Sequence, residues 1–240
     1  MKKQTFSISA VTLRNIALVC MLLDHLWATV VPGNFWMTCL GRLAFPIFAF
    51  QIVEGYVHTS NFKKYAQRLL LFGLLSELPF NLIYSGSLIF PFHQNVMFTL
   101  LLGLLSARDL DQFRQAEDFK QRIVAVLRMM LWCGLGAIGF VDYGANGVLT
   151  VLLFAMCRQL PHCRLFQLAG MVVLHGFLME GMHFPFLGLE LPLQGLAVLA
   201  LLPIWLYRGE KGSRSRLVQM GSYLFYPVHM LILGIIGYFF

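Results

Sequence analysis

Nine apolar segments, most of them long enough to form a membrane-spanning helix, follow one another along the 240-residue chain. A helix needs about 20 predominantly apolar residues to cross the hydrocarbon core of a bilayer. The segments lie at residues 12–31, 35–55, 65–84, 93–107, 123–141, 144–157, 165–180, 189–207 and 218–239. Charged and turn-forming residues separate them. The sequence therefore predicts an all-α fold: a polytopic transmembrane helical bundle of about nine spans, forming a single domain over residues 1–240.

The scarcity of charged residues excludes a water-soluble protein. Only 12% of the residues are charged and 58% are hydrophobic, whereas a soluble domain carries roughly a quarter of its residues as Asp, Glu, Lys and Arg. A chain of this length cannot bury so many apolar side chains in one water-soluble core. A soluble enzyme, a disordered tail and a nucleic-acid-binding module are therefore excluded, and membrane lipid is the expected surrounding partner.

The basic residues alternate regularly with the predicted spans. The loops after even-numbered spans, together with the N-terminus and the adjoining ends of the next spans, hold 16 of the 18 Lys and Arg residues, and the other loops hold none. These 16 are Lys2, Lys3, Lys63, Lys64, Arg68, Arg108, Arg114, Lys120, Arg122, Arg128, Arg158, Arg164, Arg208, Lys211, Arg214 and Arg216. Because cytoplasmic loops are enriched in Lys and Arg, we expect the N-terminus in the cytoplasm and the C-terminus outside. The net charge of +7 then records topology and not an acidic partner.

Two regions of this scheme are less regular. The fourth and sixth spans are short, so each could be tilted, buried among other helices or partly re-entrant. Residues 108–122 carry four basic and four acidic side chains, which is typical of a solvated cytoplasmic loop or a surface helix.

Several ionisable side chains fall inside the predicted spans or at their edges. Such a group costs several kcal/mol on insertion scales, so it normally faces the bundle interior and has a partner or a function. On the predicted topology most of them lie between the middle of the membrane and its outer half, and Arg14 alone lies near the cytoplasmic face. The set comprises Arg14, Asp24, His25, Arg42, Glu54, Glu77, His93, Asp142, His175, His183 and His229.

Arg14 and His25 are spaced to share one face of the first helix. Ten residues separate them, which is close to three full turns, so both side chains project in nearly the same direction about 16 Å apart along the axis. A cation at the inner end and a titratable base farther out suit a long anionic donor that enters from the cytoplasm. Its phosphates would lie on Arg14 and its reactive end at His25. Alternatively, Arg14 is an anchor that reaches lipid phosphate.

The motifs in the spans resemble the TraX family. The likeness covers nearly the whole chain in order and rests on Leu23-Asp24-His25, Gly41-Arg42-Leu43-Ala44-Phe45-Pro46-Ile47-Phe48, Ser76-Glu77-Leu78-Pro79-Phe80-Asn81, His93-Gln94-Asn95-Val96-Met97-Phe98-Thr99, Asp142-Tyr143-Gly144 and Phe225-Tyr226-Pro227-Val228-His229. TraX proteins look like a branch of a membrane acyltransferase superfamily whose first span carries an Arg, ten residues and a His. Arg14 and His25 match that spacing, whereas the nine predicted spans depart from the usual ten.

The resemblance implies an acetyltransferase of the bacterial cytoplasmic (inner) membrane. The founding TraX protein acetylates the N-terminus of conjugative pilin, and relatives in the superfamily O-acetylate sugars of surface polymers. The expected donor is acetyl-CoA, and the expected acceptor is a pilin amine or a cell-surface glycan hydroxyl. His25 is the expected general base, a role that typically contributes about 10² to 10⁴-fold in rate. Arg14 is the expected binding residue for the coenzyme phosphates.

Other residues are assigned by their chemistry and position. Asp24, Arg42, Glu77 and His93 complete the catalytic candidates. Asp24 points about 100° away from His25, so we expect it to pair with Arg42, and Arg42 could instead pair with Glu77 or polarise the reacting carbonyl. Glu77 and His93 are equally well explained as an ion pair between two helices.

The candidates for acceptor binding are Asn81, Asn95, Asp142 and His229. The two asparagines are also typical of hydrogen bonds between membrane helices, and Pro227 is expected to kink the last span beside His229. No metal is expected, because His175, Glu180 and His183 lack a second pair at ligand spacing and fit an outer polar rim better.

Two other functions remain open on the sequence alone. Asp24, His25, Glu77 and His93 could form the relay of a proton-coupled transporter, although paired broken helices are not evident. The chain could also be a non-catalytic membrane partner in pilus or envelope assembly.

Overall fold

The computed structural model describes residues 7–186, 188–210 and 216–239, with side chains in the last range from 221 to 237. The helices are α1 (Ala10–Thr29), α2 (Phe35–Gly41), α3 (Ala44–His58), α4 (Phe62–Ser85), α5 (Val96–Gln115), α6 (Phe119–Ile138), α7 (Gly144–Cys157), α8 (Cys163–Met171), the π-helical η1 (Val172–Leu178), the 3₁₀-helical η2 (Leu193–Ala200), α9 (Leu201–Leu206) and α10 (Arg216–Phe239). Two short strands, β1 (His183–Phe186) and β2 (Leu189–Pro192), complete the described elements.

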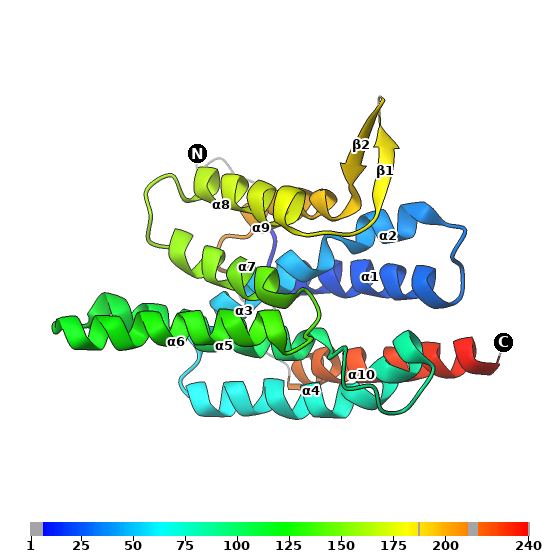
Figure 1. Ribbon diagram of the computed structural model, residues 1–240, viewed down its shortest axis with the longest axis horizontal. Coiled ribbons are helices and arrows are strands. Elements are labelled where there is room, and N and C mark those ends of the chain that lie inside the picture. The colour runs from blue at the N-terminus through cyan, green and yellow to red at the C-terminus, as the bar shows by residue number, and fades with distance from the viewer. Residues whose placement is uncertain (1–6, 187, 211–215, 240) are drawn as a thin grey trace, which may run out of the picture.

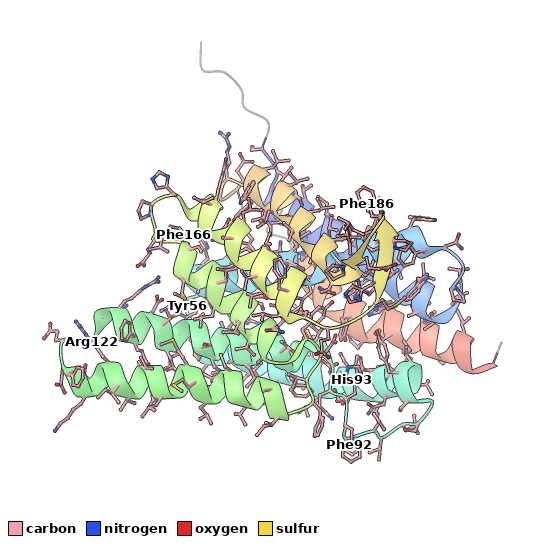
Figure 2. All side chains as sticks on the ribbon, turned by 45° about the horizontal axis from the view of Figure 1, so that its top comes forward. Tyr56, Phe92, His93, Arg122, Phe166 and Phe186 are labelled. Atoms are coloured by element: carbon pink, nitrogen blue, oxygen red, sulfur yellow. The ribbon has the colours of Figure 1, made fainter. Side chains whose placement is uncertain are left out.

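The helices lie side by side with their axes along the longest dimension of the molecule (Figure 1). The connections from α3 to α4, α5 to α6 and α7 to α8 lie at one end, and the connection from α1 to α2 lies at the other. In the side-chain view, Arg122 at the start of α6 is at the opposite end from His93 and Phe186 (Figure 2). The helix packed most closely on α4 is α10, which also contacts α1. The first and last helices are therefore neighbours.

The core lies where α1, α3, α5, α7 and the two halves of the η2–α9 segment meet. Leu13 and Ala17 of α1, Ile47 of α3, Leu104 of α5 and Val151 of α7 are completely buried. In contrast, α6 exposes large apolar residues along most of its length, among them Leu127, Met130 and Ile138. An exposed apolar helix of this kind is typical of a lipid-facing surface.

Each of the nine segments predicted from the sequence contains a helix in the described part of the chain. Among the described residues, three helical segments are long and apolar enough to cross a membrane: Ala10–Thr29, Phe35–His58, which comprises α2 and α3, and Phe119–Ile138. Shorter apolar helices cover Gly144–Cys157, Cys163–Leu178, Leu193–Leu206 and Gly221–Gly237. The helical fold is confirmed, whereas the full count of nine crossings and the sides of the two termini remain predictions.

The second predicted span is divided by a break between α2 and α3. Pro46 has no N–H to donate to the carbonyl of Arg42, and the helix is interrupted at Arg42 and Leu43. Just before the break, a Cβ at Gly41 would lie 2.4 Å from the Cβ of Asp24. Only glycine allows α2 to approach α1 this closely. The break and the close approach together bring Arg42 to Asp24.

One alternative and one boundary among the expected connections are wrong. Of the loop and the helix expected for residues 108–122, the helix holds for most of the segment, because α5 continues to Gln115 and α6 begins at Phe119. Their charge is partly buried: Asp109 is 5% exposed and accepts a hydrogen bond of 2.6 Å from the Trp132 indole. The start of the eighth predicted span is also wrong, because residues 189–192 form β2, which pairs antiparallel with β1. The apolar run there belongs to a hairpin that projects beside α2 (Figure 1).

Some residues used to predict the topology lie outside the described part of the chain. They are Lys2, Lys3, Lys211 and Arg214, together with the side chain of Arg216.

Candidate functional site

The first and last helices bring two histidines into contact. His25 of α1 and His229 of α10 are buried, with 8% and 6% of their surfaces exposed. The Nδ1 atom of His25 lies 2.7 Å from Nε2 of His229, and the two rings meet edge to edge, nearly parallel at 18°, with centroids 5.0 Å apart. The other nitrogen of His229, Nδ1, lies 2.6 Å from the carbonyl oxygen of Phe225. In the described part of the chain, Nε2 of His25 has no hydrogen-bond partner.

A large cavity lies on the cytoplasmic side of this pair, by the predicted topology. Its volume is about 830 Å³, which is within the range of small-molecule sites. It is lined by residues from α1, α3, α4, α5 and α10, among them Arg14, Met21, Arg68, Tyr223 and Tyr226. Met21 precedes His25 by about one helical turn, and the Tyr226 ring lies 6.3 Å from the His25 ring. The cavity therefore extends from the predicted cytoplasmic side of the bundle to the residues next to His25.

Two arginines give this cavity a positive region. Arg14 lines it from α1, and its Nε atom is buried with no hydrogen-bond partner among the described residues. Arg68 lines it from α4 and lies over the rings of Tyr65 and Tyr223, at 5.5 and 6.0 Å from their centroids. Tyr223 also acts electrostatically on Arg14, so the two guanidinium groups flank one tyrosine. Glu54 also lines the cavity, but its carboxylate accepts a hydrogen bond from Tyr207 and lies 3.5 Å from Arg158. Two guanidinium groups in one cavity wall favour an anionic ligand.

The predicted common face of Arg14 and His25 agrees with these contacts. Both side chains lie near α10, where Arg14 is within electrostatic range of Tyr223 and His25 contacts His229. Arg68, by contrast, was counted from the sequence only among the cytoplasmic Lys and Arg residues. The structure places it in the cavity wall. No signal in the sequence distinguishes Arg68 from the other cations near the cytoplasmic ends of the helices.

Asp24 and Arg42 form the expected ion pair. Arg42 donates through NH2 to both carboxylate oxygens of Asp24, and the Thr38 hydroxyl donates to the same carboxylate at 2.7 Å. The two charged side chains are 17% and 20% exposed. The carboxylate of Asp24 therefore accepts its hydrogen bonds from Thr38 and Arg42, and it does not orient His25.

The ion pair continues into a chain of buried and partly buried hydrogen bonds. Arg42 NH1 donates to Oε1 of Gln194 at 3.3 Å, and Nε2 of Gln194 donates to Nδ1 of His175 at 3.1 Å. Nε2 of His175 therefore carries the proton and donates to the Thr150 hydroxyl at 3.0 Å. That hydroxyl donates to the carbonyl of Asn146 at 2.8 Å. We name Asp24, Arg42, Gln194, His175 and Thr150 the arginine network, in which both ring nitrogens of His175 are used.

The asparagine and glutamate of the third and fourth predicted spans hold α4 and α5 together. Glu77 accepts hydrogen bonds from the backbone and the side chain of Asn95, and Asn95 also donates to the carbonyl of Gly73 at 2.8 Å. Asn95 is completely buried and caps α5. Asn81 donates only weakly to the carbonyl of Leu88, at 3.4 Å, and its side-chain oxygen has no partner among the described residues. Asn95 thus joins two helices, as its residue type predicts.

His93 pairs with Asp142 and not with Glu77. Its Nε2 atom lies 3.8 Å from the Asp142 carboxylate, and both side chains are partly exposed in the connections before α5 and α7. The rings of Phe80 and Tyr84 pack on His93 with centroids at 4.9 and 5.4 Å. Interaction with the Asp142 carboxylate raises the pKa of His93. His93 lies in the connection between α4 and α5 (Figure 2), and Asp142 lies in the connection between α6 and α7.

The residues considered for a metal site do not come together. His175 belongs to the arginine network, whereas His183 and Glu180 are exposed. Among the described residues, no group of three or more His, Cys, Asp or Glu side chains is arranged to hold a metal ion.

Comparison with known proteins gives a consistent picture. A family described as "TraX protein" matches residues 9–237. A curated relative from Dichelobacter nodosus, described as "Probable fimbrial assembly protein FimC, serogroup H1", is 31% identical over 243 residues, covering 94% of this chain and 94% of the relative. No solved structure matches the chain.

Proposed function

The chain belongs to the TraX family, and from this premise we propose that it is an integral membrane acetyltransferase that uses acetyl-CoA and acts in pilus or fimbrial assembly. The observation that carries the proposal is the cavity of about 830 Å³ that has two arginines in its wall and ends beside His25. The name of the Dichelobacter nodosus relative supports the assembly context, and the acceptor then follows as the N-terminal amine of a pilin-like protein. A surface glycan hydroxyl would require the same base.

The donor occupies the cavity with its phosphates between Arg14 and Arg68. Guanidinium groups bind phosphate oxygens through paired, charge-assisted hydrogen bonds, and the low dielectric of a protein interior strengthens them. Along α1, His25 lies about 16 Å beyond Arg14. A thioester at the end of a long, flexible arm then reaches the level of His25, while the nucleotide remains near the cytoplasm.

His25 acts as the general base of the transfer. It takes a proton from the acceptor while the acceptor nitrogen or oxygen bonds to the thioester carbonyl carbon. It then returns that proton to the sulfur as the carbon–sulfur bond breaks. Arg42 lies close enough to act electrostatically on His25, and its charge favours the oxyanion that develops on the carbonyl. The acceptor approaches from the side of His93 and Asp142, where both side chains are partly exposed.

The membrane arrangement belongs to the same proposal. We place nine spans in a bacterial inner membrane with the N-terminus in the cytoplasm. Arg14 and Arg68 then lie toward the cytoplasm, which contains acetyl-CoA. The three long apolar helices support membrane insertion. Cysteine-labelling from each side of sealed vesicles, at the α3–α4 connection and at the β1–β2 hairpin, tests this arrangement. Labelling of both positions from the same side contradicts it.

The activity is tested with purified protein, radiolabelled acetyl-CoA and a synthetic pilin N-terminal peptide. Acetyl transfer to the peptide amine, and none to a peptide with a blocked amine, is the expected result. For donor binding, Arg14→Ala and Arg68→Ala each lose a charged hydrogen-bond partner and bind acetyl-CoA about 10- to 100-fold more weakly. Lys64→Ala is the matched control, because Lys64 lies on α4 near Arg68 but outside the cavity wall. Equal affinity in all three variants contradicts the donor site.

A second candidate is a non-catalytic membrane partner in fimbrial assembly. The name of the Dichelobacter nodosus relative favours it, because that name states assembly and no reaction. The two candidates differ in one measurement: an assembly partner supports fimbriation equally well with His25→Asn, whereas an acetyltransferase loses acetylated pilin in the same strain.

A further inference from the structure

His229 makes hydrogen bonds with the Phe225 carbonyl and with His25. The bond to Phe225 determines which histidine donates in the bond to His25. A carbonyl oxygen only accepts, so the 2.6 Å contact with Phe225 requires a proton on Nδ1 of His229. A neutral imidazole carries one proton, and its other nitrogen is an acceptor. Nε2 of His229 therefore accepts, and across the 2.7 Å contact His25 must donate from Nδ1. The carbonyl of Phe225 thus determines which nitrogen of His25 carries the proton.

This chain leaves Nε2 of His25 unprotonated and available. We propose that His229 is a positioning residue that holds His25 in the Nδ1–H tautomer, so that Nε2 is the nitrogen that receives the acceptor proton. The inference rests on the proposed function, in which His25 is the base. It changes the role of His229, which the sequence assigned to acceptor binding. Carboxylates commonly serve as the partner of a catalytic histidine, but Asp24 is already bonded to Arg42 and Thr38.

Ring packing holds the same geometry. Two rings hold His229, because the Phe225 ring stacks on it at 4.8 Å and the His25 ring meets it edge to edge with centroids 5.0 Å apart. Tyr226 contacts both histidines, at 6.3 Å from His25 and 5.8 Å from His229. A ring so enclosed loses little further entropy when it binds its partner, which is how a positioning group keeps a base in place.

The tautomer can be measured without any activity. Protein labelled with ¹⁵N-histidine gives separate NMR shifts for protonated and unprotonated ring nitrogens, and His25→Asn assigns the His25 signals by their loss. In the wild type we expect a protonated Nδ1 and an unprotonated Nε2. His229→Gln keeps an acceptor at the Nε2 position and should preserve this pattern, whereas His229→Phe removes the acceptor and should shift the proton toward Nε2. A wild-type His25 protonated at Nε2, or His25 shifts unaffected by His229→Phe, overturns the inference.

Kinetics separate positioning from folding. His229→Phe should lower kcat by about 10²-fold or more, since the wrong tautomer disables a catalytic histidine. The KM for acetyl-CoA should change by less than about threefold, because His229 is outside the cavity wall, and His229→Gln should recover kcat to within about tenfold of the wild type. If His229→Phe does not fold, the spectra and kcat of the wild type and His229→Gln still decide, because an inactive His229→Gln with an intact Nδ1–H tautomer contradicts positioning.

The proposed function and this inference fail in different ways. A wild type that transfers no acetyl group to any acceptor refutes the acetyltransferase, while the NMR spectra still report the hydrogen bond. An active wild type whose kcat is unaffected by His229→Phe refutes the positioning role alone.

Discussion

Two buried histidines of this protein use their ring nitrogens differently. His175 donates to Thr150 from one nitrogen and accepts from Gln194 at the other, so its hydrogen-bonding capacity is complete. His25 is bonded through Nδ1 to His229, and Nε2 is without a hydrogen-bond partner among the described residues. A ring nitrogen that no protein group occupies is free to accept a hydrogen bond or a proton from a ligand. Under the proposed function, His25 is therefore the base and His175 is a structural histidine.

Replacing His25 should have the largest effect on catalysis. In His25→Asn the amide nitrogen can still donate to His229, but no base remains, so kcat should fall by about 10² to 10⁴-fold. The measurement is single-turnover transfer from radiolabelled acetyl-CoA, with thermal unfolding in detergent as the control for folding. Full activity of the folded variant would contradict the role of His25 as the base.

Breaking the ion pair of the arginine network should have the largest effect on stability. Asp24→Asn leaves the Arg42 guanidinium uncompensated in a mostly buried position, which destabilises a protein by up to about 3–5 kcal/mol. Denaturant unfolding in mixed micelles measures the change in the free energy of unfolding. The double variant Asp24→Leu with Arg42→Met removes both charges and should recover most of that loss. If the single variant is as stable as the wild type, the network is not a structural element.

Replacing His175 should affect stability more than chemistry. His175→Leu keeps the volume but leaves the Gln194 amide without its acceptor and Thr150 without its donor, at a cost of about 1–3 kcal/mol. The kcat of the folded variant should stay within about threefold of the wild type. A large loss of kcat without loss of stability would reverse the assignment of the two histidines.

His93 provides the smallest and most specific test, because it is a partly exposed histidine with a carboxylate partner. Asp142 raises the pKa of His93 in the folded state, so the protonated form stabilises the fold. This contribution is complete below the ordinary histidine pKa of about 6.5 and is lost as the pH rises through the folded-state value. Partial exposure limits it to about 1 kcal/mol or less. Unfolding measured from pH 5 to 9 should show the decrease, and His93→Gln should lack it; identical profiles contradict the pair.

The helices could be predicted because they depend on local sequence. Apolar runs predicted a helix in each of the nine segments, and helical periodicity predicted that Arg14 and His25 share a face. The pairing of Asp24 with Arg42 was also expected, since both lie in apolar surroundings and carry opposite charges. These features depend on one helix or on two consecutive helices.

The partners from distant segments could not be predicted in this way. His229 is 204 residues from His25 and Gln194 is 152 residues from Arg42, and no periodicity relates such positions. Asp109 was assigned to solvent because charged residues surround it, although Trp132 of the next helix buries it. The β1–β2 hairpin was missed because its apolar residues resemble the start of a span. Tertiary packing determines each of these contacts.

The contact between α1 and α10 also sets the time at which the site is assembled. The two residues that form it are separated by most of the chain, and a ribosome adds about 5–20 residues per second. His25 is therefore inserted roughly 10–40 s before His229 has been synthesised. During that interval a growing chain has a first helix with a histidine but no partner to fix its tautomer. Catalytic competence would then begin only once the final helix has joined the bundle, and a chain truncated before it would remain inert.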